Sequence, residues 1–186
     1  LVFDDITGIS ATNTLTFSGE GTNNTKVTYD GAQGGATVII DGTDHIRFEN
    51  IYFESTAMSD AVTMLVMNHA DYLTYVNCKF KCQYANFAYC FAGAPNENEL
   101  FRSNQSCNNL TIDSCSFETA EYGISISADM GQEFSNIKVM NSTFSGHETG
   151  LDFKGISNVL VSGNSFQTSS RALDFMQNRR TEICYN

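Results

Sequence analysis

Two aspartates occupy the same sequence setting and could together do chemistry. The segments Leu151-Asp-Phe153 and Leu173-Asp-Phe175 place Asp152 and Asp174 between apolar residues, 22 positions apart. If the segments are equivalent strands of neighbouring coils, both carboxylates point outward at about one strand spacing, roughly 4.8 Å. Such a pair can act as acid and nucleophile on a glycoside, bind Ca²⁺ that neutralises a uronate, or share a proton. Lys154 projects from the same face.

The residues that flank this pair suit contact with a polysaccharide. His147, Glu148 and Arg171 fall on the adjoining turn, and Lys154, His147 or Arg171 could serve as the base that a lyase needs. Tyr84 and Tyr122 precede the equivalent strands of earlier coils, where aromatic faces can stack on sugar rings. The alternative is an ordinary solvated face on which Lys154 relieves repulsion between carboxylates.

A repeat that closes on phenylalanine positions these residues. Five segments share one register, and their closing residues are separated by steps of 27, 37, 27 and 22 residues; the segments are 45–53, 72–80, 109–117, 136–144 and 158–166. Steps of this size are typical of solenoid coils with loops of different length. We expect Phe53, Phe80, Phe117, Phe144 and Phe166 to stack as one internal column.

In each segment the alternation of inward and outward side chains changes phase once, which predicts a corner in the chain. In the first segment Ile46 and Phe48 alternate on one phase and Ile51 and Phe53 on the other, so the chain bends at Asn50. The equivalent positions are Asn77, Ser114, Asn141 and Gly163. Asn and Gly tolerate left-handed backbone, and stacked coils would align the asparagines in a ladder.

A third strand follows each closing phenylalanine by seven and nine residues. These positions are apolar throughout: Phe87 and Tyr89, Ile124 and Ile126, Leu151 and Phe153, Leu173 and Phe175. Three strands per coil predict an all-β, right-handed, three-sided parallel β-helix of about six to seven coils, in which residues 1–186 form a single domain. Because Leu1 begins within a strand-like run, we expect the domain to be part of a longer chain and to associate with further repeats.

Charge and composition exclude several classes of partner. The net charge of −11, with only ten Lys and Arg, argues against nucleic acid, and no apolar run approaches the ~20 residues of a membrane span. Six cysteines, an even number without zinc-knuckle spacing, favour a secreted or cell-surface protein. Cys78 and Cys115 share an inward position, so we expect a stacked thiol pair in the core.

The coil pattern resembles the pectin-lyase-like superfamily of β-helical proteins, which includes pectate lyases, polygalacturonases and pectinesterases. The resemblance covers nearly the whole chain and is closest to the pectinesterase opening, in Leu15-Thr-Phe-Ser-Gly-Glu-Gly21 and Thr37-Val-Ile-Ile-Asp-Gly42. The catalytic carboxylates of pectinesterases correspond to Ala85 and Tyr122 here, and the expected glutamine is Asp60. The resemblance therefore implies the fold and argues against pectinesterase activity.

Two functional hypotheses from different classes follow. The first is a polysaccharide lyase or glycoside hydrolase acting on an acidic glycan, with Asp152, Asp174 and Lys154 as catalytic residues and the two aspartates as ligands of Ca²⁺. The second is a non-catalytic β-helix that serves as a carbohydrate-binding, adhesive or structural segment of a larger surface protein.

Overall fold

The chain folds into parallel β-strands that stack along one axis. The computed structural model describes residues 1–30, 35–56, 62–82, 99–103, 107–128 and 134–186. Among these residues there are seventeen strands, every strand pairing is parallel, and no helix occurs. This agrees with the expected all-β architecture.

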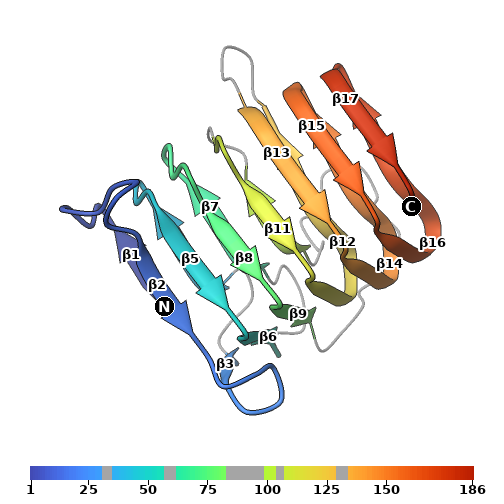
Figure 1. Ribbon diagram of the computed structural model, residues 1–186. Coiled ribbons are helices and arrows are strands. Elements are labelled where there is room, and N and C mark those ends of the chain that lie inside the picture. Colours follow the sequence, from blue (N-terminus) through green and yellow to red (C-terminus); the bar gives the residue numbers. More distant parts are fainter. Residues whose placement is uncertain (31–34, 57–61, 83–98, 104–106, 129–133) are drawn as a thin grey trace.

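The first face is a sheet of seven parallel strands, whose neighbours come from successive coils (Figure 1). In spatial order its strands are β2 (Leu15–Ser18), β5 (Ile46–Glu49), β8 (Thr74–Val76), β11 (Thr111–Asp113), β13 (Phe134–Met140), β15 (Ile156–Ser162) and β17 (Arg179–Cys184). Along the inner strands of this sheet, alternate residues enter the core, as the burial of Ile46 and Phe48 in β5 illustrates.

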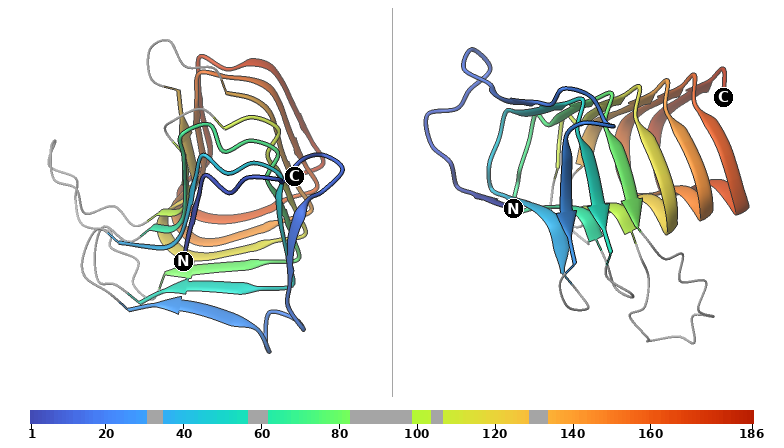
Figure 2. Two further views of the ribbon diagram at one scale, coloured as in Figure 1. Left: turned by 90° about the vertical axis from the view of Figure 1, so that its left-hand side faces the viewer. Right: turned by 90° about the horizontal axis from the view of Figure 1, so that it is seen from below.

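The second and third faces are joined by three long strands that run through both: β12 (Ser116–Ser127), β14 (Thr143–Lys154) and β16 (Ser165–Met176). In earlier coils the second face is formed by β3 (Lys26–Tyr29), β6 (Tyr52–Ser55) and β9 (Lys79–Cys82). The third face there is formed by β1 (Val2–Asp4), β4 (Ala36–Asp41), β7 (Val62–Met67) and β10 (Glu99–Ser103). The view along the axis in Figure 2 shows the coils superimposed around a common interior. The arrangement is that of a three-sided parallel solenoid.

The phenylalanine column of the second face is confirmed. The five closing residues are register partners from one coil to the next. Their rings stack with centroid distances of 5.4, 4.7, 4.8 and 4.8 Å. Phe53, Phe80, Phe117 and Phe144 are fully buried, whereas Phe166 in the last of these coils is only partly buried. Stacked apolar rings thus form a large part of the core.

The corner between the first and second faces is also confirmed. All five predicted positions have left-handed backbone, with φ of 59° at Asn50, 50° at Asn77, 55° at Ser114, 49° at Asn141 and 67° at Gly163. The Asn77 side-chain amide donates to the Asn50 side-chain oxygen at 2.7 Å, as the ladder requires. The ladder is interrupted at Ser114, where Asn141 donates instead to Asp113 at 2.9 Å.

An internal ladder follows this corner and was not predicted. The backbone N–H of the residue after each left-handed position donates to the side chain of the equivalent residue one coil further on: Cys78 to Cys115 (3.4 Å), Cys115 to Ser142 (3.0 Å), Ser142 to Asn164 (2.9 Å) and Asn164 to Asn186 (2.9 Å). These contacts satisfy buried N–H groups that the bend removes from the sheet. Cys78 and Cys115 are buried free thiols in this ladder, as expected of a core pair.

A second column of left-handed residues lies just before or near the start of the strands of the first face. Its members are His45, Tyr72, Asn109, Asn136, Asn158 and Arg180, with φ between 53° and 60°. The asparagines form a ladder in which Asn136 donates to Asn109 at 3.0 Å and Asn158 donates to Asn136 at 3.2 Å. The coils from β5 onward therefore have two sharp corners with left-handed backbone.

One strand assignment was wrong. The third strand of the coil that contains β9 is β10, which pairs with β7 on one side and β12 on the other. Phe87 and Tyr89, the residues predicted to form this strand, lie outside the described residues. Counting from Phe80 failed because this coil carries its extra residues before the third strand rather than after it. Phe101, not Phe87, occupies the inward position beside Ile124.

Candidate functional site

The two aspartates stand in register on the outward side of the third face. Asp152 in β14 pairs with Asp174 in β16 on one side and with Ser125 in β12 on the other. Leu151 and Phe153 on either side of Asp152 belong to the core, so the carboxylate is directed away from it. The structure thus brings the proposed carboxylate pair onto neighbouring strands.

Asp152 is far less exposed than an outward residue of a sheet normally is. The residue is 6% exposed, and its Oδ2 accepts a hydrogen bond from Lys154 Nζ at 2.9 Å. Its Oδ1 is buried and has no hydrogen-bond partner among the described residues. A buried carboxylate oxygen without a donor is costly, because it has lost water and gained nothing in return.

Asp174 is paired in a similar manner but is more open. Its Oδ2 accepts from Arg171 Nη1 at 2.6 Å, and 29% of its side chain is exposed. Arg171, which the sequence placed on the adjoining turn, lies three residues before Asp174 on the same strand and is exposed. Each aspartate therefore carries a cationic partner from its own strand.

These ion pairs limit the chemistry of the site. Carboxylates that accept from lysine or arginine already use an acceptor oxygen in that contact. A Ca²⁺ ion prefers six to eight oxygen ligands. The described residues contain no group of three or more His, Cys, Asp or Glu that could hold a metal. The pair alone fits Ca²⁺ poorly, because Lys154 and Arg171 already compensate both charges. A cation there would depend on oxygens of a bound glycan.

His147 is placed in the interior and not on the open turn that the sequence suggested. It is fully buried; its Nε2 lies 3.0 Å from the Phe117 carbonyl oxygen and its Nδ1 lies 3.3 Å from that of Ala120. Burial lowers the pKa of the imidazole, an effect that the two carbonyls partly offset. In this position His147 cannot reach a ligand outside the coil, and its contacts link two coils.

The other predicted binding residues are dispersed. Glu148 is exposed, and Tyr122, on the third-face part of β12, is partly exposed and pairs with Thr149 of β14. Tyr84 lies outside the described residues. The structure therefore gathers Asp152, Asp174, Lys154 and Arg171 on one face and leaves His147 apart from them.

A groove on the first face was missed by sequence reasoning. The groove is lined by Ala11, Thr14, His45, Arg47, Tyr72, Thr74, Asn109 and Thr111 and has a volume of about 370 Å³. The sequence signal was present: an aromatic residue stands at a corner where later coils use asparagine.

Comparison of the chain with protein-family models, with curated proteins and with solved structures found no match. A functional assignment must therefore come from the geometry of these two surfaces. A helix long and apolar enough to cross a membrane does not occur among the described residues.

Proposed function

We propose that this chain is a secreted or cell-surface β-helix of the right-handed, pectin-lyase-like type that associates with polysaccharide through its third face. The outward row Ser125, Asp152 and Asp174 supplies polar groups on successive coils along the solenoid axis. A regular spacing of about 4.8 Å between coils suits an extended polymer, which can repeat similar contacts from coil to coil.

The register of Asp152 with Asp174, together with the partial exposure of Asp174, is the observation that carries this proposal. A hydroxyl group of a bound sugar can donate to the carboxylate of Asp174, whose side chain is 29% exposed. Lys154 holds Oδ2 of Asp152 and so fixes that carboxylate beside Asp174.

Binding without catalysis agrees best with the ion pairs. A glycosidase needs a carboxylic acid that donates a proton to the leaving group, whereas Asp152 and Asp174 both accept from cationic side chains. One observation favours a hydrolase or lyase as the second candidate. The two aspartates are direct register partners, which sets their backbones one strand spacing apart, close to the ~5–5.5 Å between carboxyl groups of retaining glycosidases.

The test is thermal unfolding of the parent and of Asp152→Asn/Asp174→Asn with a panel of polysaccharides. The panel contains uronate polymers and neutral polymers, each with and without Ca²⁺. A glycan that binds only the folded state raises the melting temperature. We expect at least one polymer to do so for the parent, and we expect the double variant, which keeps the shape of both side chains, to lose the rise.

Glu118→Gln is the matched control, because Glu118 is an outward carboxylate of the second face that pairs with Lys79 at 2.8 Å. It should keep the rise in melting temperature. A Ca²⁺ requirement would indicate binding through a cation, and reducing ends or unsaturated products released by the parent alone would establish catalysis. If no polymer shifts the parent, or if the double variant responds as the parent does, the third face is not the binding surface.

A further inference from the structure

The groove of the first face presents an aromatic platform to solvent. The rings of His45 and Tyr72 lie parallel, with centroids 4.5 Å apart and an interplanar angle of 12°. Tyr72 is 49% exposed, so about half of this residue is open for contact. Within the described residues, neither the His45 ring nor the Tyr72 hydroxyl takes part in a hydrogen bond with a side chain or the backbone.

Polar side chains stand beside this platform in register. Arg47, Thr74 and Thr111 are neighbours on β5, β8 and β11, and all three line the groove. Arg47 Nε donates to Glu49 at 2.5 Å, which fixes the guanidinium and compensates its charge. The two threonine hydroxyls are not used in hydrogen bonds among the described residues. Donors and acceptors therefore border an aromatic face at fixed spacing.

The N-terminal segment supplies the rest of the lining of the groove. Ala11 and Thr14 line it, and Thr14 is in register with His45 because Leu15 pairs with Ile46. A short antiparallel bridge between Ser10 and Asn13 closes the preceding turn, and the Leu15 N–H donates to the His45 carbonyl at 3.1 Å. The volume of about 370 Å³ is at the lower end of the range for small-molecule sites, about 300–1,000 Å³.

The backbone at this corner is costly for an aromatic residue. Tyr72 has φ of 57° and His45 has φ of 53°, in the left-handed region that bulky side chains rarely adopt. The next coils place Asn109, Asn136 and Asn158 at the same corner, and asparagine tolerates this conformation well. Backbone strain of this kind is concentrated at functional sites.

We propose that this groove is a second glycan subsite, in which a neutral pyranose ring stacks on Tyr72 and its hydroxyls bond to Arg47, Thr74 and Thr111. The geometry favours a neutral sugar over a uronate because Glu49 already compensates Arg47. This inference shares with the proposed function only the idea that the partner is a glycan, since it concerns a different face and different residues.

Tyr72→Asn is the decisive variant. It installs the residue that the next three coils use at the same corner, so it keeps the left-handed backbone and removes only the aromatic ring. Tyr185→Asn is the matched control, because Tyr185 is also left-handed, with φ of 56°, and is 92% exposed outside the groove. A third variant, Thr74→Val/Thr111→Val, removes two hydroxyls and keeps β-branched side chains suited to strands.

The measurement is binding of neutral gluco-, xylo- and manno-oligosaccharides, with oligogalacturonides for comparison, by calorimetry and by saturation transfer from the protein to the sugar protons. We expect a neutral oligosaccharide to bind the parent, with at least tenfold weaker binding by Tyr72→Asn, three- to tenfold weaker binding by the threonine variant and no change in Tyr185→Asn. Asp152→Asn/Asp174→Asn should bind this ligand as the parent does, which separates the subsite from the third face. The proposal is overturned if no neutral oligosaccharide binds the parent, if oligogalacturonides alone bind it, or if Tyr72→Asn binds as the parent does.

Discussion

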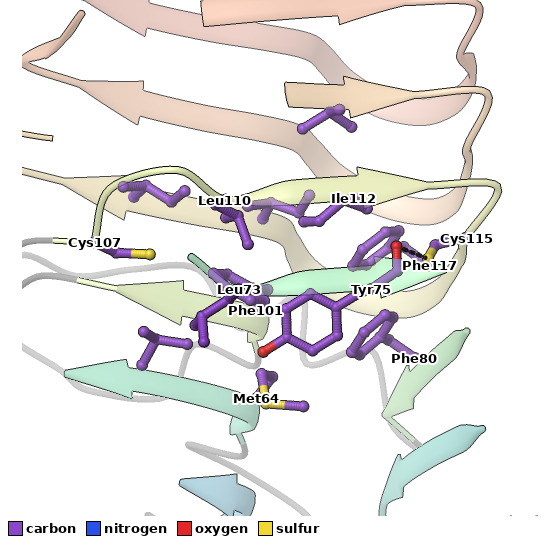
Figure 3. Close-up of a cluster of buried hydrophobic side chains, with 14 of the residues drawn as sticks. Met64, Leu73, Tyr75, Phe80, Phe101, Cys107, Leu110, Ile112, Cys115 and Phe117 are labelled. Atoms are coloured by element: carbon purple, nitrogen blue, oxygen red, sulfur yellow. Dashed lines mark hydrogen bonds between the residues drawn. The ribbon is translucent and has the colours of Figure 1, made fainter. Parts of the chain in front are cut away.

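The hydroxyl group of Tyr75 lies in the core and has no hydrogen-bond partner among the described residues, so we predict that Tyr75→Phe is more stable than the parent. Tyr75 is fully buried, stacks on Phe48 at 5.4 Å and meets Phe80 and Phe101 edge to face at 5.8 Å. Figure 3 shows its hydroxyl among apolar side chains, directed toward Met64. No described residue bonds to this oxygen, and burial raises the pKa of the phenol well above its ordinary value.

The size of the gain follows from two opposing terms. A buried polar group without a partner costs about 1–3 kcal/mol. Removing the oxygen leaves a void of about 10–15 Å³, which costs ~0.3 kcal/mol at ~24 cal/mol per Å³. The net gain is roughly 0.7–2.7 kcal/mol, or about 1–11 °C in melting temperature for a domain of this size. The aromatic contacts do not change, because phenylalanine keeps the ring.

Tyr52→Phe provides the matched control for the same chemical change. The Tyr52 hydroxyl donates to Glu54 at 2.6 Å, and we expect its removal to cost about 1–2 kcal/mol. Urea unfolding of the parent and both variants gives the free energies of unfolding. The reasoning is refuted if Tyr75→Phe is as stable as the parent or less stable, since its hydroxyl would then have a favourable interaction.

Three further predictions concern the core, a corner and pH. Phe117→Ala should lower the free energy of unfolding by about 3–5 kcal/mol in urea titrations, because Phe117 is fully buried between two stacked rings; a loss below ~1 kcal/mol would contradict its place in the column. Gly163→Val should cost about 1–2 kcal/mol, since its φ of 67° opposes a β-branched side chain, and the thermal midpoint would show this; an unchanged midpoint would exclude strain there. Burial lowers the pKa of His147, so the folded state binds a proton less readily than the unfolded state. The stability from neutral His147 is therefore complete above pH ~6.5 and is lost as the pH falls below it, by at most ~1.4 kcal/mol per pH unit. His147→Gln should flatten this part of the stability profile, and an unchanged slope would show that other groups cause it.

The features that were predictable from the sequence depend on periodicity and on residue type. The column that contains Phe117 and the corner at Asn50 both repeat at positions that the alignment identifies, and both depend on properties of the side chains themselves. The register of Asp152 with Asp174 followed from the same alignment. In a repeat protein each coil packs only on its neighbours, so equivalent sequence positions predict which residues will be in register.

The remaining features depend on what surrounds a residue. The alternation of side chains along the strand predicts that Asp152 points outward, but it does not predict that the residue is only 6% exposed. His147 also reads as a turn residue, although the bend of β14 carries it inside. The position of β10 depends on where an insertion falls, and a fixed count from Phe80 carries no information about that.

The two proposed glycan surfaces should act independently, and this provides an argument that can separate them. Tyr72 precedes β8 on the first face, whereas Asp152 belongs to β14 on the third face. On the first face, β11 and β13 separate β8 from β15, the strand that follows β14 in the chain. Residues that share no partner usually contribute additively to a free energy. If both surfaces bind one polymer, Tyr72→Asn and Asp152→Asn should multiply their effects on the dissociation constant, with less than a twofold departure from the product. A larger departure would mean that the two residues contact the same bound segment, which their positions on different faces do not allow.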